Sequence, residues 1–276
     1  MVTVITGILI LLLLLFAGAT FLRKTSLFFP YRYPEGAWDV AMLDPKPEDV
    51  WFEASDGVRL HGWLFHSDER PEQSEQSEQP VIIWSHGNAG NLSFRADAAA
   101  ELAKAGFTTF VYDYRGFGRS AGTTSESELY LDAIAAYDRI SSTTGAPIVV
   151  YGESIGGAYA AWTAANRDVC GVILESSLPS LREAARVLYS PAPIHLLTWE
   201  GLRTAEWTRA SEKPALVMHA RNDSVLPFSL GVRLRDLIGP RASMVVFEHS
   251  DHSTIAWDER ELWLGTVSSF IRNACE

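Results

Sequence analysis

Short apolar runs alternate along most of this chain with longer segments whose apolar positions recur every three or four residues. Runs of about five apolar residues are typical of strands buried on both faces. The longer periodic segments are typical of helices with one buried face. The strand-like runs are 81–85, 107–112, 147–151, 169–175, 215–219 and 244–247, and the helical patterns are 94–105, 125–140, 155–166, 228–238 and 255–271. This alternation predicts an α/β fold, with a mostly parallel central sheet and helices on both faces.

Three segments that precede this alternation have other patterns. The runs 50–54 and 58–66 flank an Asp-Gly dipeptide, and they predict a hairpin. Residues 67–80 repeat Ser-Glu-Gln and predict a solvated acidic loop. Residues 23–49 are rich in aromatic side chains and proline, and we interpret them as a membrane-proximal linker to a domain at 50–276.

The first 22 residues carry no charge between Val2 and Leu22, and a span of about 20 apolar residues can cross a bilayer as a helix. A cleaved signal peptide is the alternative, because Ala17-Gly18-Ala19 resembles a cleavage site. However, no Lys or Arg precedes the apolar block, whereas signal peptides begin with a basic region. We therefore expect a retained single-pass anchor over 1–22.

Basic residues after the anchor weakly favour one orientation of the protein in the membrane. Arg23, Lys24 and Arg32 follow the span, and the enrichment of basic residues on the cytoplasmic side favours a cytoplasmic domain. Three residues leave the side of the membrane open.

Composition narrows the function classes. The chain has 276 residues, of which 47% are hydrophobic, and this length and composition suit one sizeable domain. Its net charge of −11, with no basic stripe, argues against nucleic-acid binding. Cys170 and Cys275 have neither metal-ligand spacing nor the pattern of a disulfide framework, and we expect Cys170 to be a small buried side chain.

The motif Gly152-Glu153-Ser154-Ile155-Gly156-Gly157 follows a predicted buried strand and begins a predicted helix. A serine at such a sharp turn projects its hydroxyl clear of its neighbours, so Ser154 is the candidate nucleophile. The same pattern arises by chance in roughly one chain in ten of this length, as a glycine-rich turn with a helix-capping serine. Whether the motif is catalytic therefore depends on the presence of the other residues that a catalytic site needs.

A serine hydroxyl needs a base, and the base needs a group that orients it. His252 follows the last predicted strand and is our candidate base, with His249 as the nearest competitor. Asp223 follows an earlier strand and gives the chain order serine, acid, histidine. Glu175 also ends a strand and is the alternative acid, whereas Asp251 is too close in sequence to reach around the ring of His252.

Acyl transfer also needs donors for the negative charge that develops on the carbonyl oxygen. The backbone N–H of Ile155 is one candidate, because it opens the helix after the serine. The second should come from the glycine-containing loop at 86–91, where we favour Asn88 over Ala89.

With these residues, the chain from Val50 onward resembles the α/β-hydrolase fold family of serine hydrolases. The likeness rests on the elbow, His86-Gly87-Asn88-Ala89-Gly90-Asn91, Tyr112-Asp113-Tyr114-Arg115-Gly116-Phe117-Gly118, and the loops of Asp223 and His252. Within that family the chain looks like the membrane-anchored branch of depalmitoylating thioesterases and poorly characterised esterases. The resemblance implies a triad of Ser154, His252 and Asp223, oxyanion donors at Asn88 and Ile155, and no metal or organic cofactor. It also implies a structural role for Asp113 and Arg115.

The expected activity is hydrolysis of an ester or thioester through an acyl-enzyme. Residues 177–213 carry eight large apolar side chains that could form a small helical cap or pack on the sheet. A cap beside a membrane anchor indicates an apolar acyl or lipid-like substrate. A serine peptidase of the same fold and a non-catalytic membrane scaffold are the alternatives.

Overall fold

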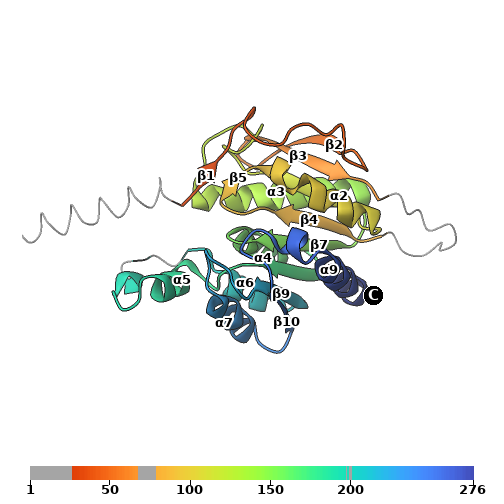
Figure 1. Cartoon of the computed structure of the whole chain (residues 1–276). Helices are drawn as coiled ribbons and strands as arrows, with labels where there is room; N and C mark the ends of the chain where they lie inside the picture. Colours follow the sequence, from red (N-terminus) through yellow and green to blue (C-terminus); the bar gives the residue numbers. More distant parts are fainter. Residues whose placement is uncertain (1–26, 68–78, 197, 199–200) are drawn as a thin grey trace, which may run out of the picture.

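A central sheet of eight strands organises the computed structural model (Figure 1), which describes residues 27–67, 79–196, 198 and 201–276. The predicted anchor at 1–22 and most of the acidic Ser-Glu-Gln loop lie outside the described residues. The strand order is β10-β9-β8-β7-β4-β6-β3-β2. The strands are β2 (Glu48–Glu53), β3 (Arg59–Phe65), β4 (Val81–Ser85), β6 (Thr109–Asp113), β7 (Ile148–Glu153), β8 (Gly171–Glu175), β9 (Ala215–Ala220) and β10 (Ala242–Phe247).

Strand direction confirms the mostly parallel sheet. β3 runs antiparallel to both β2 and β6, and the β2–β3 pair is the predicted hairpin. All other neighbours in the sheet are parallel. Two short strands, β1 (Phe29–Pro30) and β5 (Ala89–Gly90), pair separately from the main sheet.

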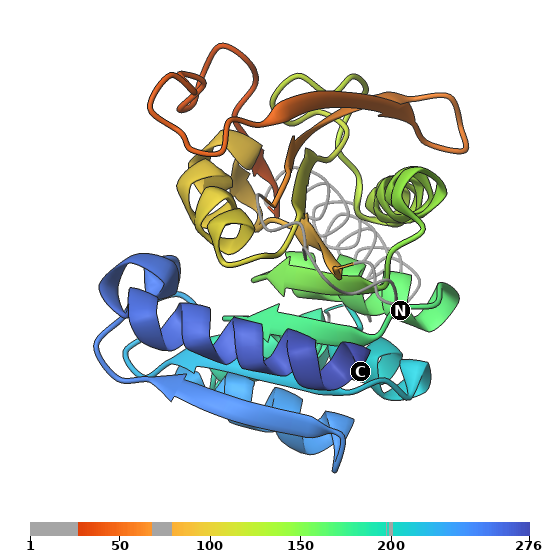
Figure 2. The same ribbon diagram turned by 90° about the vertical axis from the view of Figure 1, so that its right-hand side faces the viewer.

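Helices cover both faces, which confirms the predicted α/β architecture. One apolar core joins the sheet to α3, α4, α6 and α7, and a second core on the other face joins it to α2 and α9. Figure 2 shows α2 and α3 on opposite sides of the sheet. The helical elements are η1 (Leu92–Arg95), α2 (Ala96–Lys104), α3 (Glu126–Thr144), α4 (Gly156–Asn166), α5 (Leu181–Leu188), η2 (Ile194–Leu196), α6 (Thr204–Ser211), α7 (Phe228–Ile238), α8 (Ile255–Asp258) and α9 (Arg260–Cys275).

The predicted closing helix is two helices, α8 and α9, separated at Glu259. The Glu259 carboxylate accepts hydrogen bonds from the backbone N–H of His249 (2.9 Å) and from Ser250 Oγ (2.7 Å). At this interruption, Glu259 holds the loop that contains His249 and Ser250. The spacing of apolar residues along the predicted helix does not reveal this contact.

None of the helices in the described ranges is long and apolar enough to cross a membrane.

Arg115 joins the end of β6 to α3. Its guanidinium contacts Asp132 at 2.6 Å and Asp56 at 2.6 Å, and both Arg115 and Asp132 are buried. Removing one partner of a buried ion pair typically costs about 3–5 kcal/mol, because the other charge is left without compensation. This arrangement is a structural one, as the family resemblance implies.

A disulfide between Cys170 and Cys275 corrects our expectation that neither cysteine belongs to a disulfide framework. The two Cα atoms are 5.1 Å apart, although the residues are separated by 105 positions in sequence. The bond ties the segment that leads into β8 to the end of α9. Two widely spaced cysteines carry no pairing pattern, so only the packing of α9 on the sheet brings them together.

Reduction of this disulfide should lower the free energy of unfolding by about 2–4 kcal/mol, because the unfolded chain loses a long covalent loop. Urea unfolding with and without dithiothreitol measures the change. The Cys170→Ser, Cys275→Ser double variant should be insensitive to the reductant. Alkylation of both cysteines in the non-reduced, denatured protein would contradict the disulfide.

Candidate active site

Ser154 occupies a sharp turn between β7 and α4 with a backbone φ of +54°. Its N–H donates to the carbonyl of Glu175 (2.8 Å), and its carbonyl accepts from Ser177 Oγ (2.7 Å). A non-glycine residue in this left-handed region is strained, and such strain persists only where the surroundings hold it. A Cβ at Gly156 would lie 2.0 Å from the carbonyl oxygen of Ser85, so only glycine fits beside the turn.

His252 and Asp223 complete a continuous chain of hydrogen bonds from Ser154. His252 Nε2 lies 3.1 Å from Ser154 Oγ, and His252 Nδ1 lies 2.8 Å from Asp223 Oδ2. All three residues are buried. The loops after β7, β9 and β10 supply them, so the carboxyl edge of the sheet brings together residues that are 98 and 29 positions apart. A hydroxyl placed in this way can transfer its proton to the imidazole as it attacks a carbonyl carbon.

Asp223 is held ionised in this setting. Burial opposes its charge, but the hydrogen bond and charge of His252 outweigh burial and lower the pKa of Asp223 below its ordinary value. Its Oδ1 also accepts from the backbone N–H groups of Val225 (2.9 Å) and Leu226 (2.7 Å). A carboxylate fixed in this way can orient the imidazole and stabilise its protonated form.

The alternative residues have other contacts. The Glu175 carboxylate accepts a hydrogen bond from the Tyr151 hydroxyl and makes none with the His252 ring. His249 is exposed, and its backbone N–H donates to Glu259.

Asp251 has a positioning contact that the sequence analysis missed. It accepts from Ser224 N–H (2.7 Å), Ser224 Oγ (2.9 Å) and His252 N–H (2.6 Å). It therefore joins the loop of the acid to the loop of the histidine. Its place directly before His252 is the only sign of this contact in the sequence, and that place predicts only that Asp251 does not reach around the ring.

The candidate oxyanion donors are Ile155 and Asn88. Within the described ranges, the backbone N–H groups of these two residues donate to no other group. Asn88 is fixed from the other side, because its carbonyl accepts from Phe29 N–H (2.8 Å) and its Nδ2 donates to the Leu27 carbonyl (3.1 Å). Nearby, Asn91 Nδ2 donates to the carbonyls of Tyr31 (3.0 Å) and Glu35 (2.8 Å).

The segment at 27–35 is therefore part of the site's support, although its sequence indicates only a linker. β1 pairs in parallel with β5 of the loop that carries Asn88. Backbone pairing of two residues leaves no hydrophobic pattern, which explains why the sequence analysis missed it.

Two buried glutamates lie beside the serine at the ends of adjacent strands. Glu153 and Glu175 are paired in register across β7 and β8. Arg95 forms a two-pronged ion pair with Glu153, at 2.7 Å through Nε and 2.5 Å through Nη2. Burial opposes ionisation of Glu153, but the charge of Arg95 lowers the pKa of Glu153 below its usual range. Burial and the neighbouring Glu153 instead raise the pKa of Glu175 to about 7.

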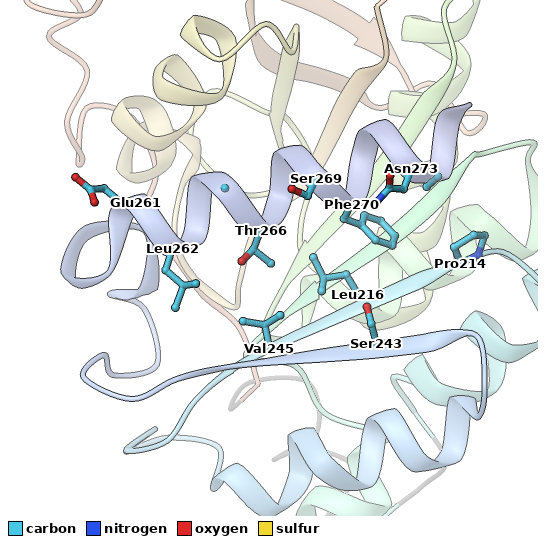
Figure 3. A pocket seen from close by; sticks show the side chains of 12 residues that line it. Pro214, Leu216, Ser243, Val245, Glu261, Leu262, Thr266, Ser269, Phe270 and Asn273 are labelled. Carbon is cyan, nitrogen blue, oxygen red and sulfur yellow. The ribbon is translucent and has the colours of Figure 1, made fainter.

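Two surface hollows differ in their distance from Ser154. One of about 630 Å³ lies between α9 and the edge strand β10. Figure 3 shows Leu262, Thr266 and Phe270 of that helix facing Leu216 and Val245 of the strands, and no candidate catalytic residue lines it. A second hollow of about 410 Å³ is lined by Glu153 and Glu175 next to the elbow. No group of His, Cys, Asp and Glu side chains in the described part of the chain could hold a metal ion.

The family model described as serine aminopeptidase, S33, matches residues 76–207, a range that includes Ser154 but ends before Asp223 and His252. The esterase of Pyrococcus furiosus has a similar structure, with a TM-score of 0.71 over 91% of this chain and 99% of its own. At 19% identity, that likeness shows the fold alone.

Sequence relatives are more similar. An uncharacterized protein of Mycobacterium tuberculosis H37Rv is 35% identical over 215 residues, which cover 77% of this chain and 74% of the relative. The lysophosphatidylserine lipase ABHD12 of Rattus norvegicus is 32% identical over 80% of this chain, which spans 60% of the lipase. The fold, the family match and this level of identity show that the chain belongs to the α/β-hydrolase family of serine hydrolases.

Proposed function

We propose that this protein hydrolyses carboxylic ester or thioester bonds of substrates with an apolar acyl chain, through an acyl-enzyme on Ser154. The observation that carries the proposal is the unbroken hydrogen-bond chain from Ser154 Oγ through His252 to Asp223. The assignment of the enzyme to the serine hydrolases agrees with the sequence-based prediction.

The mechanism follows from the positions of these groups. His252 Nε2 takes the Ser154 proton as Oγ bonds to the carbonyl carbon, and the carbonyl oxygen becomes an oxyanion. The N–H groups of Ile155 and Asn88, which have no acceptor among the described residues, supply the donors for that charge. When the tetrahedral intermediate collapses, the alcohol or thiol leaves with the proton from His252. A water activated by the same imidazole then releases the acid and restores Ser154.

Apolar residues near the site support an acyl or lipid-like substrate. The segment around α5 and η2 exposes several large apolar side chains, and Figure 1 shows α5 at the same end of the molecule as β1 and β5. These side chains are Val187, Leu188, Tyr189, Ile194 and Leu196. A lysophosphatidylserine lipase and an esterase stand among the similar proteins, and their names favour ester cleavage.

We also propose that residues 1–22 anchor the enzyme to a membrane. Residues 27–35, which we call the strap, begin five residues after that segment and support Asn88. The strap exposes Phe29, Tyr31 and Tyr33, and aromatic side chains are enriched where proteins meet the bilayer surface. An anchor at this point would hold the active-site edge of the sheet close to the lipid.

The disulfide indicates on which side of the membrane the domain lies. Disulfides persist in oxidising compartments and are rare in the cytosol. The Cys170–Cys275 bond therefore favours a domain on the side opposite the cytoplasm, against the weak lean from three basic residues. We adopt this orientation.

A serine peptidase is the second candidate, because the matching family model carries an aminopeptidase description. It would use the same three residues on an amide bond. A non-catalytic scaffold is disfavoured by the complete and buried hydrogen-bond chain.

Ser154→Ala should lower kcat/KM for p-nitrophenyl butyrate by about 10⁴-fold or more, since the attacking atom is removed. Ser142→Ala, an exposed serine on α3, is the matched control and should leave turnover unchanged. Turnover of Ser154→Ala near that of the wild type would refute the mechanism. Cleavage of aminoacyl p-nitroanilides without cleavage of the ester would favour the peptidase.

Asp251→Ala should reduce kcat/KM by about 10- to 100-fold, because both loops lose their shared acceptor and His252 shifts relative to Ser154. Asp251→Asn keeps one acceptor oxygen and should recover most of the activity. Asp236→Asn, on the exposed part of α7, serves as the control. Full activity in Asp251→Ala would show that the loops hold their positions without it.

External protease should digest the domain in right-side-out membrane vesicles that carry the full chain, because we place the domain on the side opposite the cytoplasm. The undigested protein should remain in the membrane fraction after an alkaline carbonate wash. Protection in right-side-out vesicles with digestion in inverted ones would overturn the orientation. Release by the carbonate wash would overturn the anchor.

A further inference from the structure

The hollow beside the elbow combines aromatic and charged walls. It has a volume of about 410 Å³ and opens where β7 and β8 end. Its floor includes a buried tryptophan, whereas three aromatic side chains nearer its rim are exposed to solvent. The aromatic residues are Tyr31, Trp84, Phe94 and Trp257, and the charged residues are Arg95, Glu153 and Glu175.

The hollow adjoins the reacting serine on the side of the histidine. A methyl group built on Gly87 would contact both Ser154 Cβ (3.5 Å) and Arg95 Nη2 (3.6 Å). Ser253, which directly follows His252, lines the hollow. A leaving group receives its proton from the histidine, so it departs on this side. The hollow is therefore in place for the alcohol part of an ester.

Of the two acids that line the hollow, Glu175 has a carboxylate oxygen that accepts no hydrogen bond from the described residues, whereas Glu153 is paired with Arg95. Arg95 and Glu153 satisfy each other through two hydrogen bonds. Glu175 Oε2 accepts from the Tyr151 hydroxyl, which in turn accepts from Trp263 Nε1 (3.0 Å). No group in the described ranges donates to Glu175 Oε1, and this oxygen is accessible to solvent although Glu175 as a whole is only 4% exposed. An accessible carboxylate oxygen that lines a hollow and has no donor in the protein can pair with a donor or a positive charge on a ligand.

We propose that this hollow binds a positively charged group, an ammonium or quaternary ammonium, on the alcohol part of the substrate. The inference rests on the proposed ester hydrolysis. The carboxylate of Glu175 supplies the opposite charge, and the rings of Trp257 and Phe94 supply the electron-rich faces that attract organic cations. Since the Arg95–Glu153 pair is neutral as a unit, an ionised Glu175 leaves the hollow with one net negative charge.

The preference for a cation should depend on pH. Burial and Glu153 raise the pKa of Glu175 to about 7, and they outweigh Tyr151, His252 and Arg95, which lower it. Glu175 is therefore mostly neutral at pH 6 and mostly charged at pH 8, so attraction for a cation strengthens as the pH rises. The ratio of kcat/KM for two esters with the same acyl group cancels any effect of pH on the chemical steps that the two substrates share.

Butyrylcholine and 3,3-dimethylbutyl butyrate form the test pair, because they share acyl group and shape and differ by one positive charge. The purified full chain should favour the choline ester by about tenfold in kcat/KM at pH 8, with a several-fold smaller preference at pH 6. Glu175→Gln should bring the ratio close to one at both pH values. Glu206→Gln, an exposed glutamate on α6, is the matched control and should keep the wild-type ratio.

Trp257→Leu provides a second variant that does not depend on a buried substitution, because Trp257 is 51% exposed. It should lower the ratio several-fold. A wild-type ratio of one or less, or a ratio unchanged by Glu175→Gln, would overturn the cation site. Higher kcat/KM for alanine p-nitroanilide, which carries its free amine on the acyl part, than for butyrylcholine would also overturn the cation site. Failure of the proposed function is distinct, because the enzyme would then cleave neither these esters nor p-nitrophenyl butyrate.

Discussion

A left-handed turn at Ser154, with φ +54°, sets the geometry on which the rest of the site depends. The turn is held by the bond from Ser154 N–H to the Glu175 carbonyl on the neighbouring strand, and by glycines that let α4 begin against Ser85. It directs the hydroxyl away from the sheet and leaves the N–H of Ile155 without a partner in the described residues. The proposed nucleophile and one proposed oxyanion donor therefore come from the same few residues, and the other loops need only be positioned around them.

Polar clamps within the loops provide that positioning. Asp251 joins the loops of Asp223 and His252, Glu259 holds the histidine loop from the start of the last helix, and the strap at 27–35 fixes the loop of Asn88. In the first two clamps a carboxylate accepts from backbone N–H groups, and in the third the Leu27 carbonyl accepts from Asn88 Nδ2. The strap also connects the loop of Asn88 to the N-terminal segment, so the membrane anchor and the oxyanion donor that we propose would share one stretch of chain.

Periodicity along the chain predicted the architecture, and motif spacing singled out the candidate site residues. Val81–Ser85 and Phe228–Ile238 have the predicted bounds, because buried strands and one-sided helices impose patterns on consecutive residues. Ser154, His252 and Asp223 could be proposed because each follows a predicted strand. Contacts that depend on tertiary packing left no such pattern. The Cys170–Cys275 bond, the Arg95–Glu153 pair and the β1–β5 pairing join residues whose neighbours in sequence give no sign of them.

The most direct test of the account is the site of covalent labelling by a fluorophosphonate, which reacts with a serine activated by an adjacent base. Peptide mapping by mass spectrometry should find one adduct, on Ser154, in the folded wild-type protein. The adduct should be lost in His252→Ala, since the hydroxyl then has no base at 3.1 Å. Folded protein that remains unlabelled at Ser154, or that is labelled equally without His252, would contradict the central claim.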